Sequence, residues 1–409
     1  MAESIDELTD LPPPVILTAD EHPLREEHIP REIQRVLDQL CSSGYKGYIA
    51  GGGIRDLLIG RRPKDFDVVT DARPEQVRRL FRNSRLVGRR FRLAHVMTPA
   101  GFIEVSTFRA GVEETPQGNR FVARSDSGVI LRDNKYGSPV EDAFRRDFTI
   151  NALFLDSRTY ELIDYVGGLK DIEARMVRSI GEPVQRIRED PVRMIRAVRF
   201  AASCGFSLEP GLRRAVVQEK DHLGEASAAR MYEEVKKLFL CGNATRVFAL
   251  LIETGLLTPM FPELAEALES DSVQHRWLER VMKQLDRWRE HGVEVSADLL
   301  VSLLFAKVHE RLAAYHMEHG LAAYPAMEMA VTEHLVRLGK HVFVPRAVIH
   351  HVAQLMAMQT RFHSFKSKNI KAMTRRPCFR DAFIYFKLNA RFEGINEEAV
   401  AWWEQNLGS

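Results

Sequence analysis

The chain has 409 residues, of which 45% are hydrophobic and 28% charged, and its formal net charge is +2. These values are ordinary for a water-soluble protein of two or three domains. The four cysteines are scattered without Cys-x-x-Cys spacing, which favours a reducing compartment over a zinc ribbon or a disulfide framework. The start of the chain is acidic, unlike a signal peptide, and no apolar stretch is long enough to span a bilayer. We therefore expect a cytoplasmic protein with no membrane contact.

The first half of the chain alternates between short β-rich and helical stretches. Residues 1–30 are rich in acids and prolines and predict a flexible or loosely docked arm, which the helical pattern of Arg31–Leu40 follows. The alternation over residues 45–165 predicts an α/β unit. The glycine-rich, polar stretch 110–128 predicts a mobile loop.

A glycine turn opens the α/β stretch. Tyr48-Ile49-Ala50 is typical of a short buried strand, and the apolar spacing after Gly51-Gly52-Gly53 predicts a helix. Such a turn lets backbone N–H groups contact an anion without interference from a Cβ atom. It is not a P-loop, because no Gly-Lys-Ser/Thr follows, and three glycines alone can equally form a plain turn.

Two acidic residues follow this turn in a β-rich run. Side chains at positions i and i+2 share one face of a strand, so Asp65 and Asp67 should point the same way while Phe66 faces the core. Adjacent carboxylates repel unless a cation bridges them, and Mg²⁺ prefers oxygen ligands. A lone Asp-x-Asp is more often a surface turn, but the glycine turn before it favours a metal site.

A third acid and a basic cluster come next. Strand alternation places Glu104 opposite Ile103 and Val105, so it could complete the metal cluster or be an ordinary solvated residue. Basic side chains gather just before it, and their density indicates phosphate or RNA contact, although a solvated helix face is the usual explanation of a charge run. The cluster consists of Arg78, Arg79, Arg82, Arg85, Arg89, Arg90 and Arg92.

Two further motifs combine acids with arginines. Residues 141–148 predict a helix on which Asp147 shares a face with Asn151. A second helix is predicted to open near Asp190, a good N-cap, followed by Pro191 at a suitable first position. The arginines Arg193, Arg196 and Arg199 then recur at spacing three and would repel one another unless they meet anions or carboxylates.

Helical periodicity dominates after residue 172, with clear examples at Met231–Leu240, Val247–Leu257 and Trp277–Trp288. Between residues 361 and 380, basic residues occur without an acid and phenylalanines lie among them. This pattern suits single-stranded RNA, but the aromatic residues could equally be the core of a helix pair. The basic residues are Arg361, Lys366, Lys368, Lys371, Arg375, Arg376 and Arg380.

Several of these motifs together resemble one known family. The chain is similar to the class II nucleotidyltransferases of the polymerase β superfamily, which comprise bacterial poly(A) polymerases and CCA-adding enzymes. The match covers roughly residues 45–265. It rests on Gly51-Gly52-Gly53-Ile54-Arg55-Asp56, Asp65-Phe66-Asp67, Arg145-Arg146-Asp147-Phe148-Thr149-Ile150-Asn151-Ala152, Asp164-Tyr165-Val166-Gly167-Gly168 and Arg188-Glu189-Asp190-Pro191-Val192-Arg193.

The resemblance implies a role for each motif. Two Mg²⁺ ions would bind Asp65 and Asp67, with ATP as the substrate and Asp147 in the catalytic cluster or on the ribose. Asp190 and Arg193 would read the base edge of the incoming nucleotide without a nucleic-acid template. The other nucleotide-binding residues would be Gly52, Gly53, Arg55, Arg146 and Arg196, and the RNA-binding residues Arg89, Arg90, Arg92, Lys366, Lys368, Lys371, Arg375 and Arg376.

The stretch Gly88–Val96 resembles the poly(A) polymerase branch more than the CCA-adding branch. We therefore expect addition of AMP from ATP to RNA 3′ ends, as in mRNA polyadenylation. One alternative is tRNA nucleotidyltransferase activity that adds CCA or part of it. Another is a non-catalytic RNA-binding protein on the same fold. The sequence does not identify any protein partner.

The resemblance also implies an architecture: an α/β nucleotidyltransferase head followed by an all-α neck, body and tail. We divide the chain into an arm (1–35), the catalytic head (36–171), a neck that binds nucleotide and RNA (172–268), and a body and tail that bind RNA (269–409). Poly(A) polymerases of this type often carry a long arginine-rich tail, and the sequence here ends at Gly408-Ser409.

Overall fold

The computed structural model describes residues 13–88, 92–99, 101–110, 122–124, 130–133, 135–363 and 367–407, with the backbone alone described at 122–124, 130–133 and 367–369. The chain forms two compact units. Unit 1 comprises residues up to Arg193 together with Gly205–Glu219, and unit 2 comprises Met194–Cys204 together with the chain from Lys220 onward.

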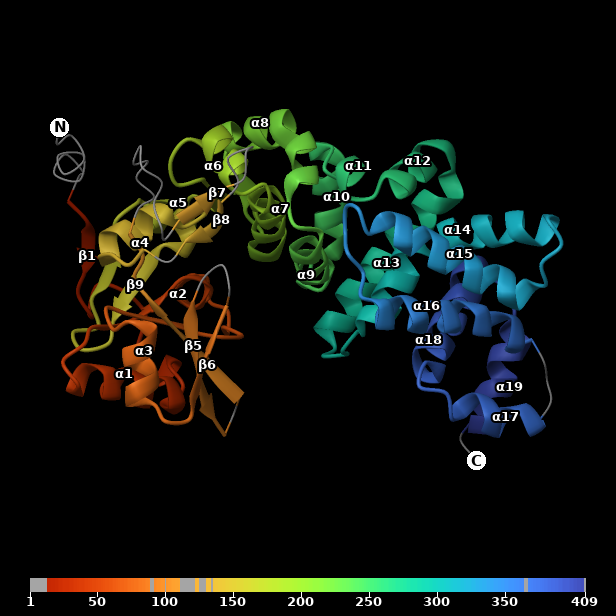
Figure 1. Cartoon of the computed structure of the whole chain (residues 1–409), viewed down its shortest axis with the longest axis horizontal. Coiled ribbons are helices and arrows are strands. Elements are labelled where there is room, and N and C mark those ends of the chain that lie inside the picture. Colours follow the sequence, from red (N-terminus) through yellow and green to blue (C-terminus); the bar gives the residue numbers. More distant parts are fainter. Residues whose placement is uncertain are drawn as a thin grey trace. The chain divides into compact units, whose positions relative to one another are not determined.

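Unit 1 is built on a mixed sheet of eight strands (Figure 1), in the order β1-β10-β9-β2-β3-β6-β5-β4. Only the β3–β6 pair within this sheet is parallel. The strands are β1 (Val15–Leu17), β2 (Gly47–Ala50), β3 (Asp67–Thr70), β4 (Ser84–Val87), β5 (Leu93–Thr98), β6 (Gly101–Thr107), β9 (Leu153–Asp156) and β10 (Leu162–Asp164). Two small pairs lie outside it, β7 (Val122–Arg124) with β8 (Ile130–Asp133), and β11 (Met176–Val177) with β12 (Ser207–Leu208).

The central strands bury side chains on both faces of the sheet. Successive side chains of a strand point to opposite faces, so neighbouring residues belong to different cores. Ile49 and Val68 belong to a core that includes residues of α1 (Arg31–Ser42) and α3 (Pro74–Leu80). Tyr48 and Val69, the neighbouring residues on each strand, belong to a second core on the other face with Ala143 of α4 (Pro139–Arg145). The expected α/β head is therefore confirmed.

Helices α1 and α3 thus contribute to the first core and α4 to the second, and helix α7 (Val192–Cys204) carries the chain into unit 2. Besides α7, the helical segments of unit 1 are η1 (Glu26–His28), α1 (Arg31–Ser42), α2 (Gly52–Leu58), α3 (Pro74–Leu80), α4 (Pro139–Arg145), η2 (Thr149–Asn151), α5 (Gly168–Glu173), α6 (Pro183–Glu189) and α8 (Pro210–Glu219).

Part of the predicted N-terminal arm is packed onto the head. Strand β1 pairs antiparallel with β10, and the side chains of Leu24 and Ile29 are buried in the core. Local composition could not predict this, because the pairing partner lies far along the sequence. Most of the stretch predicted as a mobile loop, 110–128, lies outside the described residues.

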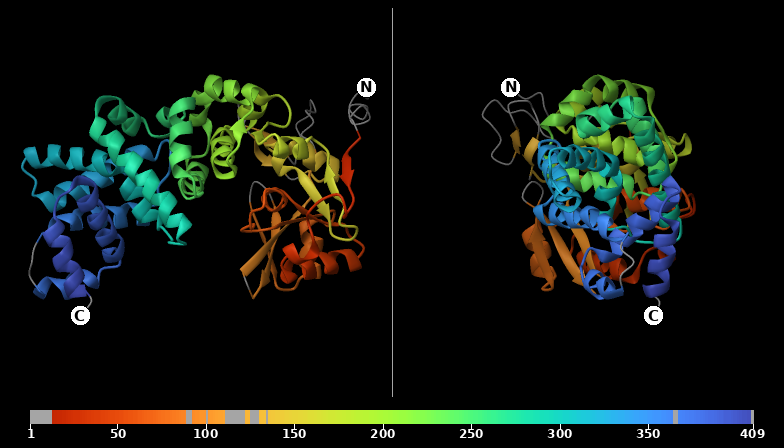
Figure 2. Two further views of the ribbon diagram at one scale, coloured as in Figure 1. Left: turned by 180° about the vertical axis from the view of Figure 1, so that it is seen from behind. Right: turned by 90° about the vertical axis from the view of Figure 1, so that its right-hand side faces the viewer.

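The described part of unit 2 contains helices and no strand (Figure 2). The predicted helices near 231–240, 247–257 and 277–288 are confirmed. The helices are η3 (Lys220–Glu225), α9 (Ala228–Phe239), α10 (Ala244–Thr254), α11 (Leu257–Met260), α12 (Pro262–Ser270), α13 (Ser272–Glu290), α14 (Ala297–Glu318), α15 (Ala323–Leu338), α16 (Arg346–Met358), η4 (Gln359–Arg361), α17 (Ser367–Thr374), α18 (Phe379–Glu393) and α19 (Glu397–Leu407). No helix among the described residues is long and apolar enough to cross a bilayer.

An aromatic cluster packs between the last helices of unit 2. Phe362 is fully buried and stacks on Phe386 with ring centroids 4.8 Å apart, and it also contacts Phe379 and Trp403. Of the two interpretations of these aromatic residues, RNA stacking or a helical core, the second is therefore correct for Phe362 and Phe379, because their rings pack against one another.

Two buried histidines meet in the middle of unit 2. His309 Nε2 lies 2.9 Å from His334 Nδ1, and both side chains are almost fully buried. Burial lowers the pKa of His309 well below its usual 6.5. Burial also lowers the pKa of His334 to about 4, although the negative charge of Glu263 opposes this shift. The folded protein therefore holds both rings neutral at physiological pH.

We predict that unit 2 loses stability as the pH falls from about 6.5 to about 4. Unfolded histidines take up protons near pH 6.5, whereas the buried pair stays neutral, so acid favours the unfolded chain. A histidine pKa lowered from 6.5 to about 4 by folding would reduce the free energy of unfolding by roughly 3 kcal/mol across this pH range. Urea unfolding at several pH values should show the free energy of unfolding falling with pH, and His309→Gln should make this dependence shallower. The exposed His319→Gln should leave it unchanged, and a slope equal in all three proteins would contradict the assignment.

Candidate active site

The site is centred on the turn between β2 and α2. Gly51 has a φ of +78°, a backbone conformation that favours glycine. A Cβ atom at this position would lie 3.1 Å from Arg146 Nη1 and 3.3 Å from Asp67 Oδ2. The glycine therefore lets a guanidinium and a carboxylate approach the turn from two other segments of the chain.

The two aspartates lie just across the sheet from this turn. Asp67 is the first residue of β3 and pairs with Ala50 on β2. Asp65 precedes the strand rather than lying within it, which corrects the predicted position. The alternation still holds, because both aspartates are exposed while Phe66 is buried.

Gly53 allows the close packing of this segment. A Cβ atom on Gly53 would lie 3.0 Å from Phe66 Cδ1 and 3.2 Å from the carbonyl oxygen of Asp65. Gly52 begins α2 directly after Gly51. The first turn of α2 and the two aspartates thus form one local unit.

A polar network around Asn151 holds the second half of the site. The Nη1 atom of Arg55 donates to Asn151 Oδ1 at 2.5 Å, and Asn151 Nδ2 donates to Asp147 Oδ1 at 3.2 Å. Arg146 Nη1 donates to the carbonyl oxygen of Asn151 at 3.1 Å. Arg55 is buried and also forms an ion pair with Asp56. The amide of Asn151 therefore connects the α2 arginine to the carboxylate of Asp147.

The helix predicted over 141–148 is wrong at its end. Helix α4 ends at Arg145, and Arg146 is extended, with φ −63° and ψ 169°. Asp147 lies between α4 and η2, so its contact with Asn151 does not arise from a shared helix face. Besides its hydrogen bond to the Asn151 carbonyl, the Arg146 side chain forms an ion pair with Asp142 at 2.9 Å and lies over the Phe154 ring, 5.1 Å from its centroid.

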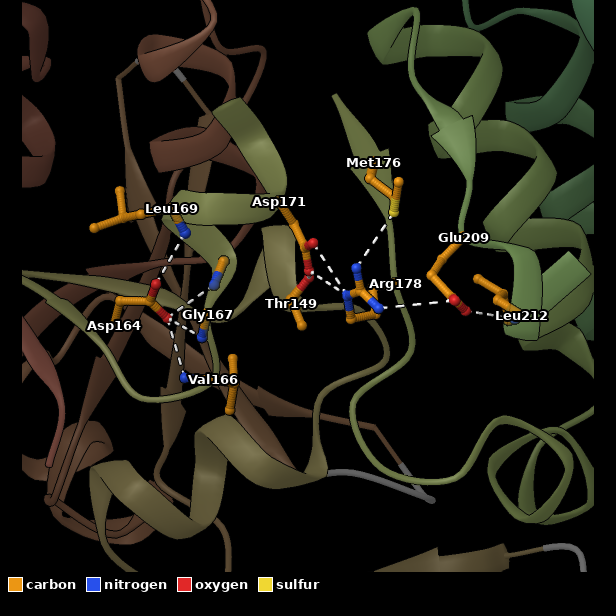
Figure 3. Close-up of polar contacts among 11 residues, drawn as sticks. Thr149, Asp164, Val166, Gly167, Leu169, Asp171, Met176, Arg178, Glu209 and Leu212 are labelled. Atoms are coloured by element: carbon orange, nitrogen blue, oxygen red, sulfur yellow. Dashed lines mark hydrogen bonds and ion pairs between the residues drawn. The ribbon is translucent and has the colours of Figure 1, made fainter. Parts of the chain in front are cut away.

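The Asp164-Tyr165-Val166-Gly167-Gly168 motif supports this region (Figure 3). The carboxylate of Asp164 accepts hydrogen bonds from the backbone N–H groups of residues 166 to 169 and so caps α5. Asp171, on α5, then accepts from the Thr149 hydroxyl at 2.7 Å and from Arg178. The motif thereby anchors η2, the segment that carries Asn151.

Glu104 is the predicted third acid of the metal cluster. The β3–β6 register places Val68 beside Val105, so Asp67 and Glu104 face the same side of the sheet. The carboxylate of Glu104 lies 3.3 Å from His95 Nε2. Among the residues that the structure describes, no group of three or more metal-ligating side chains gathers, and the metal role of Glu104 stays a prediction.

The base-reading candidates lie where α6 meets α7. Asp190 separates the two helices, because Pro191 disfavours a helical conformation in the residue before it. Arg193 Nη1 donates to the carbonyl oxygen of Arg186 at 3.0 Å and lies 3.4 Å from Glu189 Oε2. Arg193 is thus held in place by residues of α6.

The other two arginines of this series meet a carboxylate within unit 2. Arg196 Nη1 lies 3.7 Å from Glu234 Oε1, and Arg199 Nε lies 3.4 Å from Glu234 Oε2. Both guanidinium groups also lie over the Phe200 ring. The carboxylate on α9 therefore relieves the repulsion that the sequence predicted, and the phosphate contact of Arg196 stays a prediction.

The proposed RNA-binding residues have different surroundings. Arg92 forms an ion pair with Glu75 at 3.0 Å, with both side chains half exposed. Lys371 and Arg375 are exposed, and Arg376 donates to the Tyr324 hydroxyl at 3.3 Å. Only the backbone of Lys368 is described, and Arg89, Arg90 and Lys366 lie outside the described residues.

Sequence reasoning did not assign roles to Gly51, Asn151, Arg186 or Glu189. The signal for Gly51 was available, because a glycine between a strand and a helix is a candidate for positive φ. The spacing of Arg186 and Glu189 at i and i+3 was also available, since such residues are neighbours on a helix, whereas Arg193 belongs to the next helix. The partner of Arg186, 40 residues earlier in the chain, had no local signal.

Three family models match the chain. One described as "Poly A polymerase head domain" matches residues 47–178, which contain most of the site. One described as "Probable RNA and SrmB- binding site of polymerase A" matches 205–268. The third, "Polymerase A arginine-rich C-terminus", matches 319–408.

Individual proteins give the same result. The chain is 37% identical over 395 residues to poly(A) polymerase I of Salmonella typhi, covering 95% of this chain and 85% of the relative. It is 35% identical over 226 residues to a CCA-adding enzyme of Bacillus velezensis, covering 54% of this chain and 53% of that enzyme. The crystal structure of the Bacillus stearothermophilus CCA-adding enzyme with CTP superposes with a TM-score of 0.60 at 26% identity, covering 94% of this chain and 82% of that one. The head with its glycine turn and paired aspartates, and the near full-length similarity, show that the chain belongs to the poly(A) polymerase family of nucleotidyltransferases.

Proposed function

We propose that this chain transfers AMP from ATP to the 3′-hydroxyl of an RNA strand through the site at the β2–α2 turn. The 3′-hydroxyl gives up its proton to solvent as its oxygen bonds to the α-phosphorus, the bond from that phosphorus to the bridging oxygen breaks, and pyrophosphate leaves. The observation that carries this proposal is the meeting of Gly51, Asp67 and Arg146 at one turn. A backbone turn beside a carboxylate and a guanidinium suits a metal-bound triphosphate.

Each part of the site has a task in this reaction. The carboxylates of Asp65 and Asp67 would hold two Mg²⁺ ions, which supply charge neutralisation of the triphosphate and activation of the 3′-hydroxyl. Their fit is supported by two exposed acids on one side of a strand whose alternate residues are buried. Arg146 is oriented toward the turn by Asp142 and Phe154 and would bind a phosphate oxygen. Catalysis is then positioning and charge neutralisation, with no covalent intermediate.

Asp190 and Arg193 would select the base. An aspartate carboxylate accepts a hydrogen bond from an exocyclic amine, and a guanidinium donates to a ring nitrogen or carbonyl. Arg193 is held by Glu189 and by the Arg186 carbonyl, so its side chain is positioned before a nucleotide binds. Selection by protein side chains needs no template strand.

The rival activity, addition of CCA to tRNA, uses the same acids. The extent of similarity favours polyadenylation, because the poly(A) polymerase I relative aligns over 95% of the chain and the CCA-adding relative over 54%. The exposed basic residues of α17 and its surroundings favour a strand without a defined shape.

We predict that the protein makes long A-tails on unstructured RNA with ATP alone. A CCA-adding enzyme must use CTP first and stop after three nucleotides on a tRNA that lacks its 3′ end. Gel analysis of both RNAs, each with ATP or CTP alone and with the two together, separates the activities. CTP incorporation that arrests at CCA, with little extension of unstructured RNA, would establish the rival.

We predict that Asp65→Ala and Asp67→Ala each lower the rate of nucleotide addition by at least roughly 10³-fold, since a metal supplies several kcal/mol of transition-state stabilisation. The melting temperature should stay close to that of the wild type, because both aspartate side chains are exposed and support no part of the core. Asp38→Ala, on the exposed side of α1, is the matched control for loss of an aspartate. Near wild-type activity of either variant with Mg²⁺ would refute the metal assignment.

We predict that Arg193→Ala weakens discrimination between ATP and the other nucleotides by about 1–3 kcal/mol, the usual value of a base-edge contact. RNA affinity should change less. Incorporation of each nucleotide separately, with RNA binding measured in parallel, tests this. Arg188→Ala, an exposed arginine of α6 paired with Glu219, is the control. Unchanged selectivity with uniformly weaker RNA binding would make Arg193 a backbone contact instead.

A further inference from the structure

Arg186 is a largely buried arginine to which the proposed reaction assigns no task. It lies on α6, and its side chain is 15% exposed. Its Nη2 atom donates to the carbonyl oxygens of both Arg145 and Arg146, each at 2.8 Å. One guanidinium nitrogen therefore holds the backbone at the end of α4, where the segment that we call the catalytic loop, residues 146–148 between α4 and η2, begins.

The other end of the same guanidinium belongs to the base-reading region. Arg186 Nη1 donates to Glu189 Oε2 at 2.7 Å, and the same oxygen lies 3.4 Å from Arg193 Nη1. The backbone carbonyl of Arg186 accepts a hydrogen bond from Arg193 as well. A continuous path of polar contacts thus runs from Arg193 through Glu189 and Arg186 to the backbone of Arg146.

This arrangement is poorly explained by stability alone. Burial lowers the pKa of Arg186 to about 10, the positive charge of Arg193 acts in the same direction, and Glu189 opposes them. Two guanidinium groups share one carboxylate, so the positive charge is only partly compensated. Buried ion pairs add little net stability compared with apolar packing. The contacts do, however, fix direction, since a planar guanidinium can donate to several acceptors at once.

We propose that Arg186 is a positioning residue that couples base selection to the catalytic loop. Through the carbonyls of residues 145 and 146 it sets where the Arg146 side chain leaves the backbone, beside Asp67. Through Glu189 it sets the orientation of Arg193. The inference rests on the proposed base-reading role of Arg193.

The first test compares Arg186→Met, which keeps the length of the side chain, with Arg186→Lys, which keeps the charge. Incorporation of ATP and of CTP, the kcat and KM for ATP, and the melting temperature are measured for each. Arg186→Met should lower the ATP preference by roughly 10-fold and lower kcat, as expected for loss of a coupled contact. Arg186→Lys should recover part of both, because an ammonium can retain the Glu189 contact.

The test has a matched control variant, and a second variant is available if Arg186→Met does not fold. Arg188→Met removes a neighbouring arginine of the same helix and should leave selectivity unchanged. If Arg186→Met does not fold, Glu189→Gln takes its place, since it leaves the charge of Arg186 uncompensated and should give the same loss of preference. A lower melting temperature of Arg186→Met, with wild-type nucleotide preference in its residual activity, would overturn the proposal and show that Arg186 only stabilises the fold.

The double variant Arg186→Met/Arg193→Ala separates this inference from the function on which it rests. If Arg186 acts through Arg193, the double variant should show no greater loss of ATP preference than Arg193→Ala alone. An additive loss would refute the coupling. An unchanged ATP preference in Arg193→Ala would instead refute the base-reading role. A lower ATP preference in Arg193→Ala, with a wild-type preference in Arg186→Met, would refute only the coupling.

Discussion

The site depends on one position where a side chain is disfavoured for two reasons. At Gly51, a Cβ atom would lie 3.1 Å from Arg146 Nη1 and 3.3 Å from Asp67 Oδ2, closer than ordinary van der Waals contact, so a side chain there would push these two groups away from the turn. The backbone conformation of this residue, φ 78° and ψ −139°, adds a second reason, because an L side chain in so sparsely populated a region costs roughly 1–3 kcal/mol. The antiparallel β2–β3 register supplies Asp67 opposite the end of β2, and the catalytic loop supplies Arg146. Any shift in either element would separate the groups.

The rest of unit 1 holds this meeting point fixed. Asn151 connects Arg55 to Asp147, and Arg146 is fixed by Asp142 on one side and the Phe154 ring on the other. The segment that carries Asn151 is itself anchored by Asp171, on a helix that Asp164 caps. Polar groups held in this way need little reorganisation when charge develops, which is the main source of electrostatic catalysis.

The sequence predicted those features that depend on neighbours in the chain. The glycine turn, the alternation that exposes Asp65 and Asp67, and the helices of unit 2 follow from local spacing. It failed where distant contacts decide. The predicted helix over 141–148 stops at Arg145, where the side chain of Arg186, some 40 residues later, binds the last carbonyls. Phe362 suited RNA stacking by composition, but its burial depends on Trp403, 41 residues away.

The chemistry of the head cannot by itself decide which tail the enzyme makes. Polyadenylation and CCA addition both need a metal-binding pair of acids, a phosphate-binding turn and side chains that read a base. The two activities differ in nucleotide selection, since a CCA-adding enzyme changes from C to A whereas a poly(A) polymerase keeps one choice. In this chain Arg193 is tied to Glu189 and to the backbone of α6, and α6 is tied through Arg186 to the catalytic loop. In the base-reading role that we propose for it, an arginine held by these partners has little freedom to change its hydrogen-bonding pattern, and such rigidity suits an enzyme that selects ATP at every step.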